Sequence, residues 1–378
     1  MFERVKKYID NRKRSKRPFV AFQVEPTSRC QLKCVMCPRT AFSHEWESGD
    51  MPLATYNSLS KYFHLTQDVH LQGWGEPLLH PGLFDMIQSA KRENCYVSLT
   101  TNGALLTGEV SLKLISEGVD IVAISIAGAT KETHESIRCG SLFDKLLKNI
   151  QTLTELKGKR QTKKPKLTLS FLMTKTNIKE LSEAVEIAKA VGIDEMVATN
   201  LDYTPTPLQD ELRVFSCKHA NPKYLDYLEL ARKRAAAIKL LFRVYPLEIE
   251  EVVMCELNPL QIVYFSHNGY SSPCVYLNLS KQGSIPRIFC GTNEVIQKVT
   301  LGNIAKNKFP EIWSSADYYH FRRAYSRRLK VLRKCDSYLS VESMNSGQLQ
   351  AFEKELEKGL SENPVPPPCK TCYKAYGI

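Results

Sequence analysis

The sequence has no apolar run that approaches the ~20 residues needed to cross a bilayer. Its N-terminus is charged and contains no hydrophobic signal core, so we expect a cytoplasmic protein without a transmembrane segment. There is also no internal repeat of the solenoid kind. In a reducing compartment the 12 cysteines are expected to be metal ligands and spare thiols, and not to form disulfides.

Acidic residues are fewer than basic ones, 40 against 52, which leaves a net charge of +12. The segment 1–18 is markedly basic, and further basic runs cover 157–166 and 322–334. Such runs could meet nucleic acid, an acidic membrane surface or an acidic electron donor. No RNA-binding signature of interleaved aromatic residues accompanies them, so solvated helix faces are the favoured interpretation and nucleic acid is disfavoured.

Short apolar runs alternate with amphipathic stretches over residues 19–245, which predicts an α/β fold of parallel βα units. The expected strands are Val20–Glu25, Asp68–Gln72, Tyr96–Thr100, Ile121–Ile126, Lys166–Met173 and Glu195–Asn200. The expected helices are Leu53–Phe63, Gly82–Arg92, Glu109–Glu117, Leu142–Lys157, Ile178–Val191 and Leu225–Leu240. Residues 246–378 have shorter runs and more Gly, Ser and Pro, and we interpret them as a second, smaller domain.

Three cysteines, Cys30, Cys34 and Cys37, lie close together directly after the first expected strand. Their C-x3-C-x2-C spacing forms a soft anionic ligand set that suits an iron–sulfur cluster or zinc. A four-iron cluster held by three cysteines keeps one iron open for another ligand, which favours chemistry over a structural role. A zinc knuckle that lacks its fourth ligand, or three structural thiols, remains an alternative.

This loop resembles the signature of the radical S-adenosylmethionine (radical SAM) enzymes. The resemblance implies a partial (β/α)6 barrel of the TIM type, with chemistry at the C-terminal ends of the strands. It also implies a [4Fe–4S] cluster whose open iron binds SAM, and a 5′-deoxyadenosyl radical that removes hydrogen from a substrate. The position before the third cysteine is often aromatic in the family and is Met36 here; its polarizable side chain can pack against adenine.

Polar motifs follow the next strands at the expected C-terminal ends. Gly73-Trp74-Gly75-Glu76-Pro77 resembles the GGEP motif of the family, which implies that Gly75 and Glu76 hold the ammonium group of SAM. Thr101, Asn102 and Ser125 stand where relatives contact the SAM carboxylate or ribose. For these three residues a hydrogen-bonded turn or strand-end role is nearly as good an interpretation.

A second cysteine set lies near the C-terminus. Cys255, Gly269 and Cys274 match the C-x9-15-G-x4-C pattern that opens the SPASM and twitch extensions of the family, and Cys369 and Cys372 close the chain. No cysteine follows Cys372, so the count favours one auxiliary [4Fe–4S] cluster with four cysteine ligands. This is the twitch arrangement, and it resembles the layout of the aminocyclitol dehydrogenase. A zinc site with the same ligands stays open.

The resemblance implies a radical SAM oxidoreductase that dehydrogenates a small molecule by two electrons. The auxiliary cluster would accept one electron, and a flavodoxin or ferredoxin-type protein would be the reductant. Modification of a peptide or protein is an alternative. It is less favoured, because the roughly twenty residues before the barrel are too few for a peptide-recognition domain. An epimerase with a cysteine hydrogen donor, for which Cys217 and Cys290 are weak candidates, stays open, as does a non-catalytic electron-transfer protein. The sequence does not specify an oligomeric state.

Overall fold

The computed structural model describes residues 17–334 and 346–378. The structure of most of the basic N-terminal segment, and that of Cys335, therefore lies outside the described residues. The described chain is built on one sheet of nine strands, in the order β7-β6-β5-β4-β3-β2-β1-β8-β9, and a separate hairpin. The first seven strands are parallel and follow one another along the sheet, as consecutive βα units require.

Each of the six expected strands is confirmed, and a seventh follows directly after the long helix near residue 240. The seven strands are β1 (Phe19–Val24), β2 (Thr66–Leu71), β3 (Tyr96–Thr101), β4 (Ile121–Ile126), β5 (Lys166–Met173), β6 (Glu195–Asn200) and β7 (Leu241–Val244). Their side chains alternate between two faces. In β5 the residues Leu167, Leu169, Phe171 and Met173 are fully buried, whereas Thr168 and Ser170 on the opposite face are half-buried.

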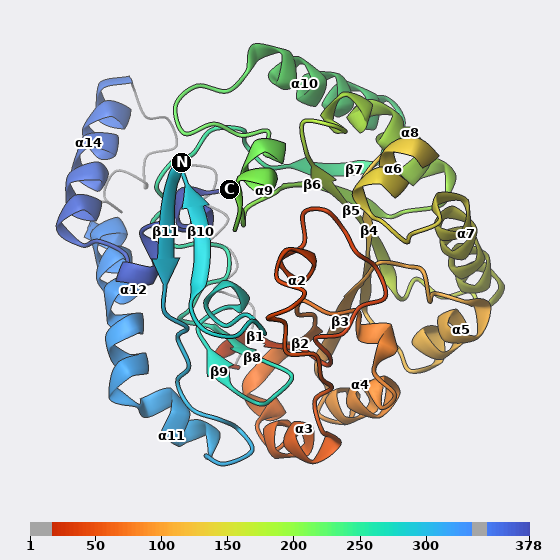
Figure 1. The fold of residues 1–378 in the computed structure, drawn as a ribbon, viewed down its shortest axis with the longest axis horizontal. Coiled ribbons are helices and arrows are strands. Elements are labelled where there is room, and N and C mark those ends of the chain that lie inside the picture. Colours follow the sequence, from red (N-terminus) through yellow and green to blue (C-terminus); the bar gives the residue numbers. More distant parts are fainter. Residues whose placement is uncertain (1–16, 335–345) are drawn as a thin grey trace.

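The buried face of the sheet packs against helices, which form an outer arc around the curved strands in Figure 1. The helices of the barrel region are α2 (Pro38–Ala41), α3 (Leu53–Ser60), α4 (Leu83–Arg92), α5 (Gly108–Ser116), α6 (Lys131–Ile137), α7 (Phe143–Lys159), α8 (Leu181–Ala190), α9 (Pro207–Leu212) and α10 (Pro222–Ala237). The other face looks into the barrel. There Thr100, Ser125, Ser170 and Thr199 are half-buried, so small polar side chains line the interior.

The C-terminal region joins the same sheet. Strand β8 (Ile262–Phe265) pairs in parallel with β1, and β9 (Ser271–Ser272) pairs with β8 in the antiparallel sense. The remaining elements are the hairpin β10 (Ile285–Phe289) and β11 (Thr292–Ile296), and helices α11 (Phe309–Ser314), α12 (Ala316–Lys334) and α14 (Ser346–Glu362). They flank the barrel on the left of Figure 1. The sheet thus continues past residue 245, and a domain boundary there stays a prediction.

One expectation about the cysteines is wrong. Cys217, in the loop between α9 and α10, and Cys290, at the turn of the β10–β11 hairpin, form a disulfide across 73 residues of sequence. Packing of the hairpin against the barrel brings the two residues together, which their sequence separation could not show. In this state neither sulfur has the S–H bond that a hydrogen donor needs. The other nine described cysteines have free thiols.

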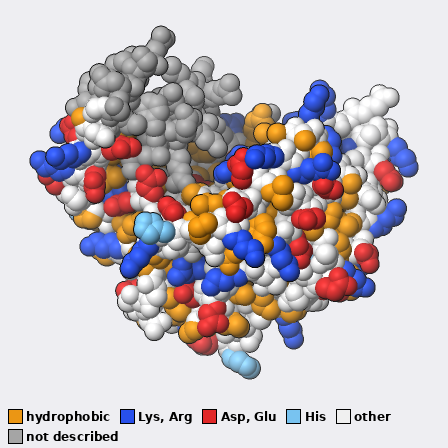
Figure 2. All heavy atoms as spheres, turned by 90° about the horizontal axis from the view of Figure 1, so that it is seen from above, with side chains coloured by type: hydrophobic (Ala, Val, Ile, Leu, Met, Phe, Trp, Pro, Cys, Tyr) orange, Lys and Arg blue, Asp and Glu red, His pale blue; other side chains and the backbone are white. Residues whose placement is uncertain are grey.

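Basic side chains are interspersed with acidic ones on the face shown in Figure 2. In the run 157–166, Lys157 pairs with Asp194, Lys164 with Asp120 and Lys166 with Glu195. These lysines therefore compensate carboxylates at the start of the strands. Within the described part of the chain, no helix is both long enough and apolar enough to span a bilayer.

Candidate functional site

The loop that carries Cys30, Cys34 and Cys37 leaves β1 and is fastened to its neighbours by backbone contacts. The N–H of Lys33 donates to the carbonyl of Cys139 (2.9 Å), and that of Val35 donates to the carbonyl of Ile137 (3.0 Å). The three cysteines and Met36 belong to one small apolar cluster. Its other members include Leu32, Ala127, Ile137 and Leu201. The loop is therefore held in place by the chain after β4 and by the end of β6.

The chemistry of these thiols suits a cationic cluster. Burial, with the nearby Cys34 as a further cause, raises the pKa of Cys37 to about 11. Burial also raises the pKa of Cys30. Neighbouring buried thiols do not ionise together unless a cation compensates their charge, which is what bound iron does. The amide nitrogen of Asn102 lies 3.6 Å from the Cys30 sulfur, so a side chain after β3 reaches the cysteine loop.

Glu76 joins the ends of β2 and β3. Its buried carboxylate accepts the Thr101 hydroxyl (2.7 Å), the backbone N–H of Asn102 (2.7 Å) and the backbone N–H of Leu78 (3.2 Å). Burial raises the pKa of Glu76, and these hydrogen bonds oppose the rise. The structure thus brings Glu76, Thr101 and Asn102 together beside Cys30, which makes this edge of the barrel a preformed polar surface.

Two glycines allow this edge to lie close to β1. A Cβ atom on Gly75 would stand 2.1 Å from the carbonyl oxygen of Thr27, and one on Gly73 would stand 2.3 Å from Cγ of Glu25. Only glycine fits at both positions. Glu25 itself is a residue that sequence reasoning missed. It is fully buried at the end of β1 and accepts the N–H groups of Trp74 (2.8 Å) and His267 (3.2 Å).

Ser125 lies one strand further along the sheet. Thr101 of β3 pairs with Ile124, which places Ser125 near the turn that begins at Asn102, and Ser125 itself pairs with Ser170 of β5. Met36 is 7% exposed within the apolar cluster of the cysteine loop. Contact with SAM stays a prediction for all the expected SAM-binding residues. The structure places them together at the C-terminal ends of the strands: Met36, Gly75, Glu76, Thr101, Asn102 and Ser125.

The four auxiliary cysteines also lie together. Cys255, Cys274 and Cys369 share an apolar cluster with Tyr325. Burial raises the pKa of Cys255 to about 12, with Cys372 as the next cause, and burial raises those of Cys274 and Cys369 as well. Like the first set, these thiols need a cation to become thiolates together. Their role as ligands stays a prediction.

In residues 17–334 and 346–378, no three His, Cys, Asp or Glu side chains are arranged to hold a single metal ion. A four-iron cube is held differently, because each cysteine binds its own iron.

Gly269 lies five residues before Cys274 in the sequence motif. It has a φ of +82°, and a Cβ there would lie 2.9 Å from both Asn303 Oδ1 and Thr55 Cγ2. The glycine of this motif is thus required by backbone conformation and by space.

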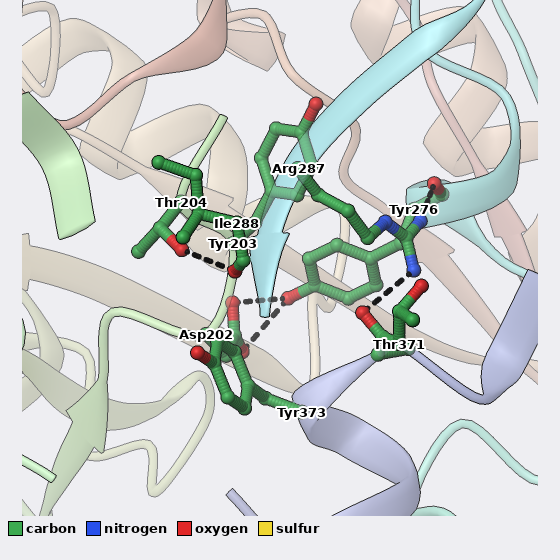
Figure 3. Close-up of a pocket in the computed structure, with 9 residues that line it drawn as sticks. Asp202, Tyr203, Thr204, Tyr276, Arg287, Ile288, Thr371 and Tyr373 are labelled. Atoms are coloured by element: carbon green, nitrogen blue, oxygen red, sulfur yellow. Dashed lines mark hydrogen bonds between the residues drawn. The ribbon is translucent and has the colours of Figure 1, made fainter. Parts of the chain in front are cut away.

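An ion network connects the auxiliary cysteine loops to the end of β6. Lys374 is buried and lies 2.7 Å from Oδ2 of Asp202 and 2.5 Å from Oε1 of Glu256. The hydroxyl of Tyr276 donates to Asp202 at 2.9 Å. Asp202 and Tyr276, joined by this hydrogen bond, line a small cavity, shown in Figure 3, which Arg287, Thr371 and residues near them also line. The cavity lies between the barrel and the auxiliary site.

An aromatic group extends from this cavity towards the edge of the barrel that carries Glu76, Thr101 and Asn102. The ring centroids of Trp74, Tyr203 and Tyr276 lie 5.8–6.3 Å from one another. The indole N–H of Trp74 donates to the carbonyl of Val275 (3.3 Å), the residue after Cys274. The motif at the end of β2 and the auxiliary cysteine loop are therefore in direct contact.

Comparison with known proteins shows the family. Residues 24–188 match the model of the radical SAM superfamily, and residues 255–337 match the SPASM model, described as an iron–sulfur cluster-binding domain. The chain belongs to the radical SAM superfamily and carries a SPASM region, as its motifs predict. It is a radical SAM enzyme, and these domains imply [4Fe–4S] clusters and SAM as its cofactors.

Among curated relatives, the chain is 27% identical to a tungsten-containing aldehyde ferredoxin oxidoreductase cofactor-modifying protein of Pyrococcus furiosus, covering 79% of this chain and 82% of that one. It is 25% identical to an AdoMet-dependent heme synthase of Methanosarcina barkeri, covering 78% and 82%. Among solved structures, SuiB of Streptococcus suis bound to S-adenosylmethionine aligns with a TM-score of 0.60 at 14% identity, over 85% and 72% of the two chains. This last likeness confirms the fold, a partial barrel of the TIM type.

Proposed function

We propose that this enzyme removes a hydrogen atom from a small molecule and oxidises it by two electrons, with the auxiliary cluster as electron acceptor. The observation that carries the proposal is the contact between Trp74 and Val275, which joins the SAM-binding edge to the auxiliary cysteine loop. A substrate held at the barrel mouth would therefore lie between the two sites. This contact between the two loops favours transfer of an electron from the substrate radical to the auxiliary cluster.

When bound, SAM and its cluster supply a hydrogen-abstracting 5′-deoxyadenosyl radical. The chain's own residues supply position and shelter. Cys30, Cys34 and Cys37 would hold the cluster, and the Glu76–Thr101–Asn102 group would orient SAM beside Cys30. Small polar side chains inside the barrel leave room for the ligands, and the surrounding barrel excludes water from the reacting atoms.

The auxiliary site would be a [4Fe–4S] cluster held by Cys255, Cys274, Cys369 and Cys372. Four protein ligands leave no iron open for substrate, so the cluster suits electron transfer. Zinc could not accept an electron, because it has no accessible redox chemistry. A flavodoxin or ferredoxin-type partner in the cytoplasm would be the reductant that supplies the electron for SAM cleavage.

Modification of a peptide or protein is the second candidate. The relatives include the PqqA peptide cyclase of Gluconobacter oxydans, 22% identical over 84% of this chain and 83% of that one. In this alternative the substrate would be a peptide instead of a small molecule, and the roles of the two cysteine sets would be the same. Epimerisation requires a thiol hydrogen donor, and the disulfide removes Cys217 and Cys290 from that role unless it is reduced.

Anaerobic reconstitution with iron and sulfide tests the assignment. The experiment counts iron and assays 5′-deoxyadenosine with SAM and dithionite, in the native protein and in a Cys30/Cys34/Cys37→Ala triple variant. We expect about eight irons in the native protein, and about four irons without SAM cleavage in the variant. About four irons with cleavage in the native protein would remove the auxiliary acceptor, and zinc with no cleavage would overturn both assignments.

The reaction type needs a separate measurement. With candidate small molecules, mass spectrometry should show a product lighter by two hydrogens for each 5′-deoxyadenosine formed. A product of unchanged mass would indicate epimerisation, and a cross-linked or otherwise altered peptide would indicate the second candidate. Either result would contradict the proposed dehydrogenation while keeping the radical SAM assignment.

A further inference from the structure

Arg287 is a buried cation that has no carboxylate partner among the described residues. It lies in β10 and is 4% exposed. Its Nη1 donates to the carbonyl oxygens of Pro368 (3.2 Å) and Thr371 (3.3 Å), and its Nη2 donates to that of Tyr276 (3.4 Å). Among the described residues no Asp or Glu lies within ion-pair distance of it, and its Nε has no hydrogen-bond partner.

Arg328, a second buried arginine, provides the contrast. It is fully buried in α12 and also donates to backbone carbonyls, those of Val252 (2.8 Å) and Val253 (3.1 Å). In addition it pairs with the carboxylate of Glu251 at 2.9 Å. Carbonyl oxygens thus solvate both guanidinium groups, but only Arg328 has its charge compensated by the described protein.

An uncompensated guanidinium in this position is costly. Arginine does not lose its proton in proteins, so it cannot escape the cost of burial by becoming neutral. A buried charge is retained where an opposite charge lies close to it. The nearest carboxylate of the same cavity, Asp202, is already engaged by Lys374 at 2.7 Å and by the Tyr276 hydroxyl.

The carbonyls that Arg287 binds show where the missing negative charge lies. Thr371 immediately precedes Cys372, Pro368 immediately precedes Cys369, and Tyr276 follows Cys274 by two residues. Figure 3 shows the guanidinium between Tyr276 and Thr371. The group therefore binds both loops that bring the auxiliary cysteines together. Four thiolates around a [4Fe–4S] core carry a net negative charge, which increases by one when the cluster is reduced.

We propose that Arg287 is the counter-charge of the auxiliary iron–sulfur cluster and favours its reduced state. This inference rests on the proposed function of the four cysteines. A fixed positive charge beside the cluster stabilises the more negative, reduced form and so raises the reduction potential. Arg287 would thereby make the cluster a better acceptor of the electron that the substrate gives up. It acts through the cluster and is a positioning residue.

The test uses the full-length Cys30/Cys34/Cys37→Ala protein, in which the auxiliary cluster gives the only iron–sulfur signal. Redox titration followed by electron paramagnetic resonance measures its midpoint potential in the parent protein and in Arg287→Lys, Arg287→Gln and Arg328→Lys versions. We expect Arg287→Gln to lower the potential, Arg287→Lys to restore most of it, and Arg328→Lys to leave it unchanged.

Equal potentials in the parent and in Arg287→Gln would overturn the proposal, as would a potential in Arg287→Lys that matches Arg287→Gln. If Arg287→Gln fails to hold iron, the lysine version decides: a near-parental potential supports a role of charge. Loss of the cluster in both versions would show that Arg287 acts by its hydrogen bonds to the cysteine loops. That result would contradict the proposal that it acts by its charge. Absence of iron in the parent would instead refute the auxiliary cluster itself.

Discussion

Trp74 donates its indole N–H to the carbonyl of Val275, 3.3 Å away and 201 residues later in the chain. The donor belongs to the motif at the end of β2, and the acceptor follows Cys274 directly. This hydrogen bond therefore connects the motif that contains Glu76 to the auxiliary cysteine loop. It also helps to immobilise the loop that would carry an auxiliary ligand.

We expect Trp74→Phe to loosen the auxiliary cluster. Phenylalanine keeps most of the contact with Tyr203 and Tyr276 but loses the hydrogen bond, whose net contribution is about 1 kcal/mol. Local opening of the loop should then be about fivefold more frequent. The measurement is the rate at which a chelator removes auxiliary iron from the Cys30/Cys34/Cys37→Ala protein.

Trp46→Phe is the control for that experiment, because the Trp46 indole donates to the carbonyl of Ser28 at 3.0 Å and not to the auxiliary loop. It should leave the rate of iron release unchanged. Equal acceleration by the two substitutions would mean that the Trp74 contact has no special effect on the auxiliary site.

Gly269→Ala should destabilise the protein more than Gly283→Ala. Both glycines have positive φ, +82° and +67°, and share the cost of about 1–2 kcal/mol for a left-handed alanine. Only at Gly269 would the new Cβ meet other atoms, at 2.9 Å, which adds about 1–3 kcal/mol of overpacking. Denaturant unfolding of the metal-free proteins measures the difference. Equal losses of stability would show that the atoms around Gly269 move to accommodate the new Cβ without a cost in free energy.

His134 should make the protein sensitive to acid. Burial lowers its pKa to about 3, with Arg138 as a further cause. Its Nδ1 accepts the N–H of Ala127 (3.3 Å), and Nε2 contacts the Ser141 hydroxyl (2.9 Å). The unfolded chain therefore binds a proton that the folded protein excludes. Stability contributed by His134 is complete above pH ~6.5 and is lost as pH falls towards ~3, by about 1 kcal/mol per pH unit.

Thermal unfolding at several pH values between 7 and 5 tests this effect. The melting temperature of His134→Gln should fall less with decreasing pH than that of the native protein. His44→Gln, a change at an exposed histidine, should keep the native pH dependence. A native-like slope in His134→Gln would show that other groups cause the acid sensitivity.

Cys290→Ser should destabilise the oxidised protein. The disulfide with Cys217 closes a long loop, with a sequence separation of 73, and such cross-links typically contribute about 2–4 kcal/mol. Under non-reducing conditions the variant should unfold at a lower temperature than the native protein. With a phosphine reductant the two should become equal. The disulfide would be contradicted if the melting temperature of the native protein did not change with the reductant. Alkylation of Cys217 and Cys290 in the absence of the reductant would contradict it as well.

Part of the fold could be predicted because its signals are local. The period-2 pattern of Lys166–Met173 reports which face of that strand is buried, and it needs no knowledge of distant residues. The cysteine spacing of the first loop is local in the same way. The polar residues at strand ends could be grouped because parallel strands place their carboxyl ends at one edge. In the structure, hydrogen bonds join Glu76 to Thr101 and Asn102, and the role of these residues as a SAM site stays a prediction.

By itself, then, the sequence determined the βα succession, the C-x3-C-x2-C loop and the family, since the signals for these lie in short stretches of the chain. Tertiary structure alone decided what lies between the sites: the Trp74–Val275 contact, the burial of Arg287 with no ion-pair partner in the described part of the chain, the Cys217–Cys290 disulfide and the pairing of β8 with β1. These features join segments that are far apart in sequence. Burial and charge compensation are properties of such packed neighbours, so no local pattern carries them.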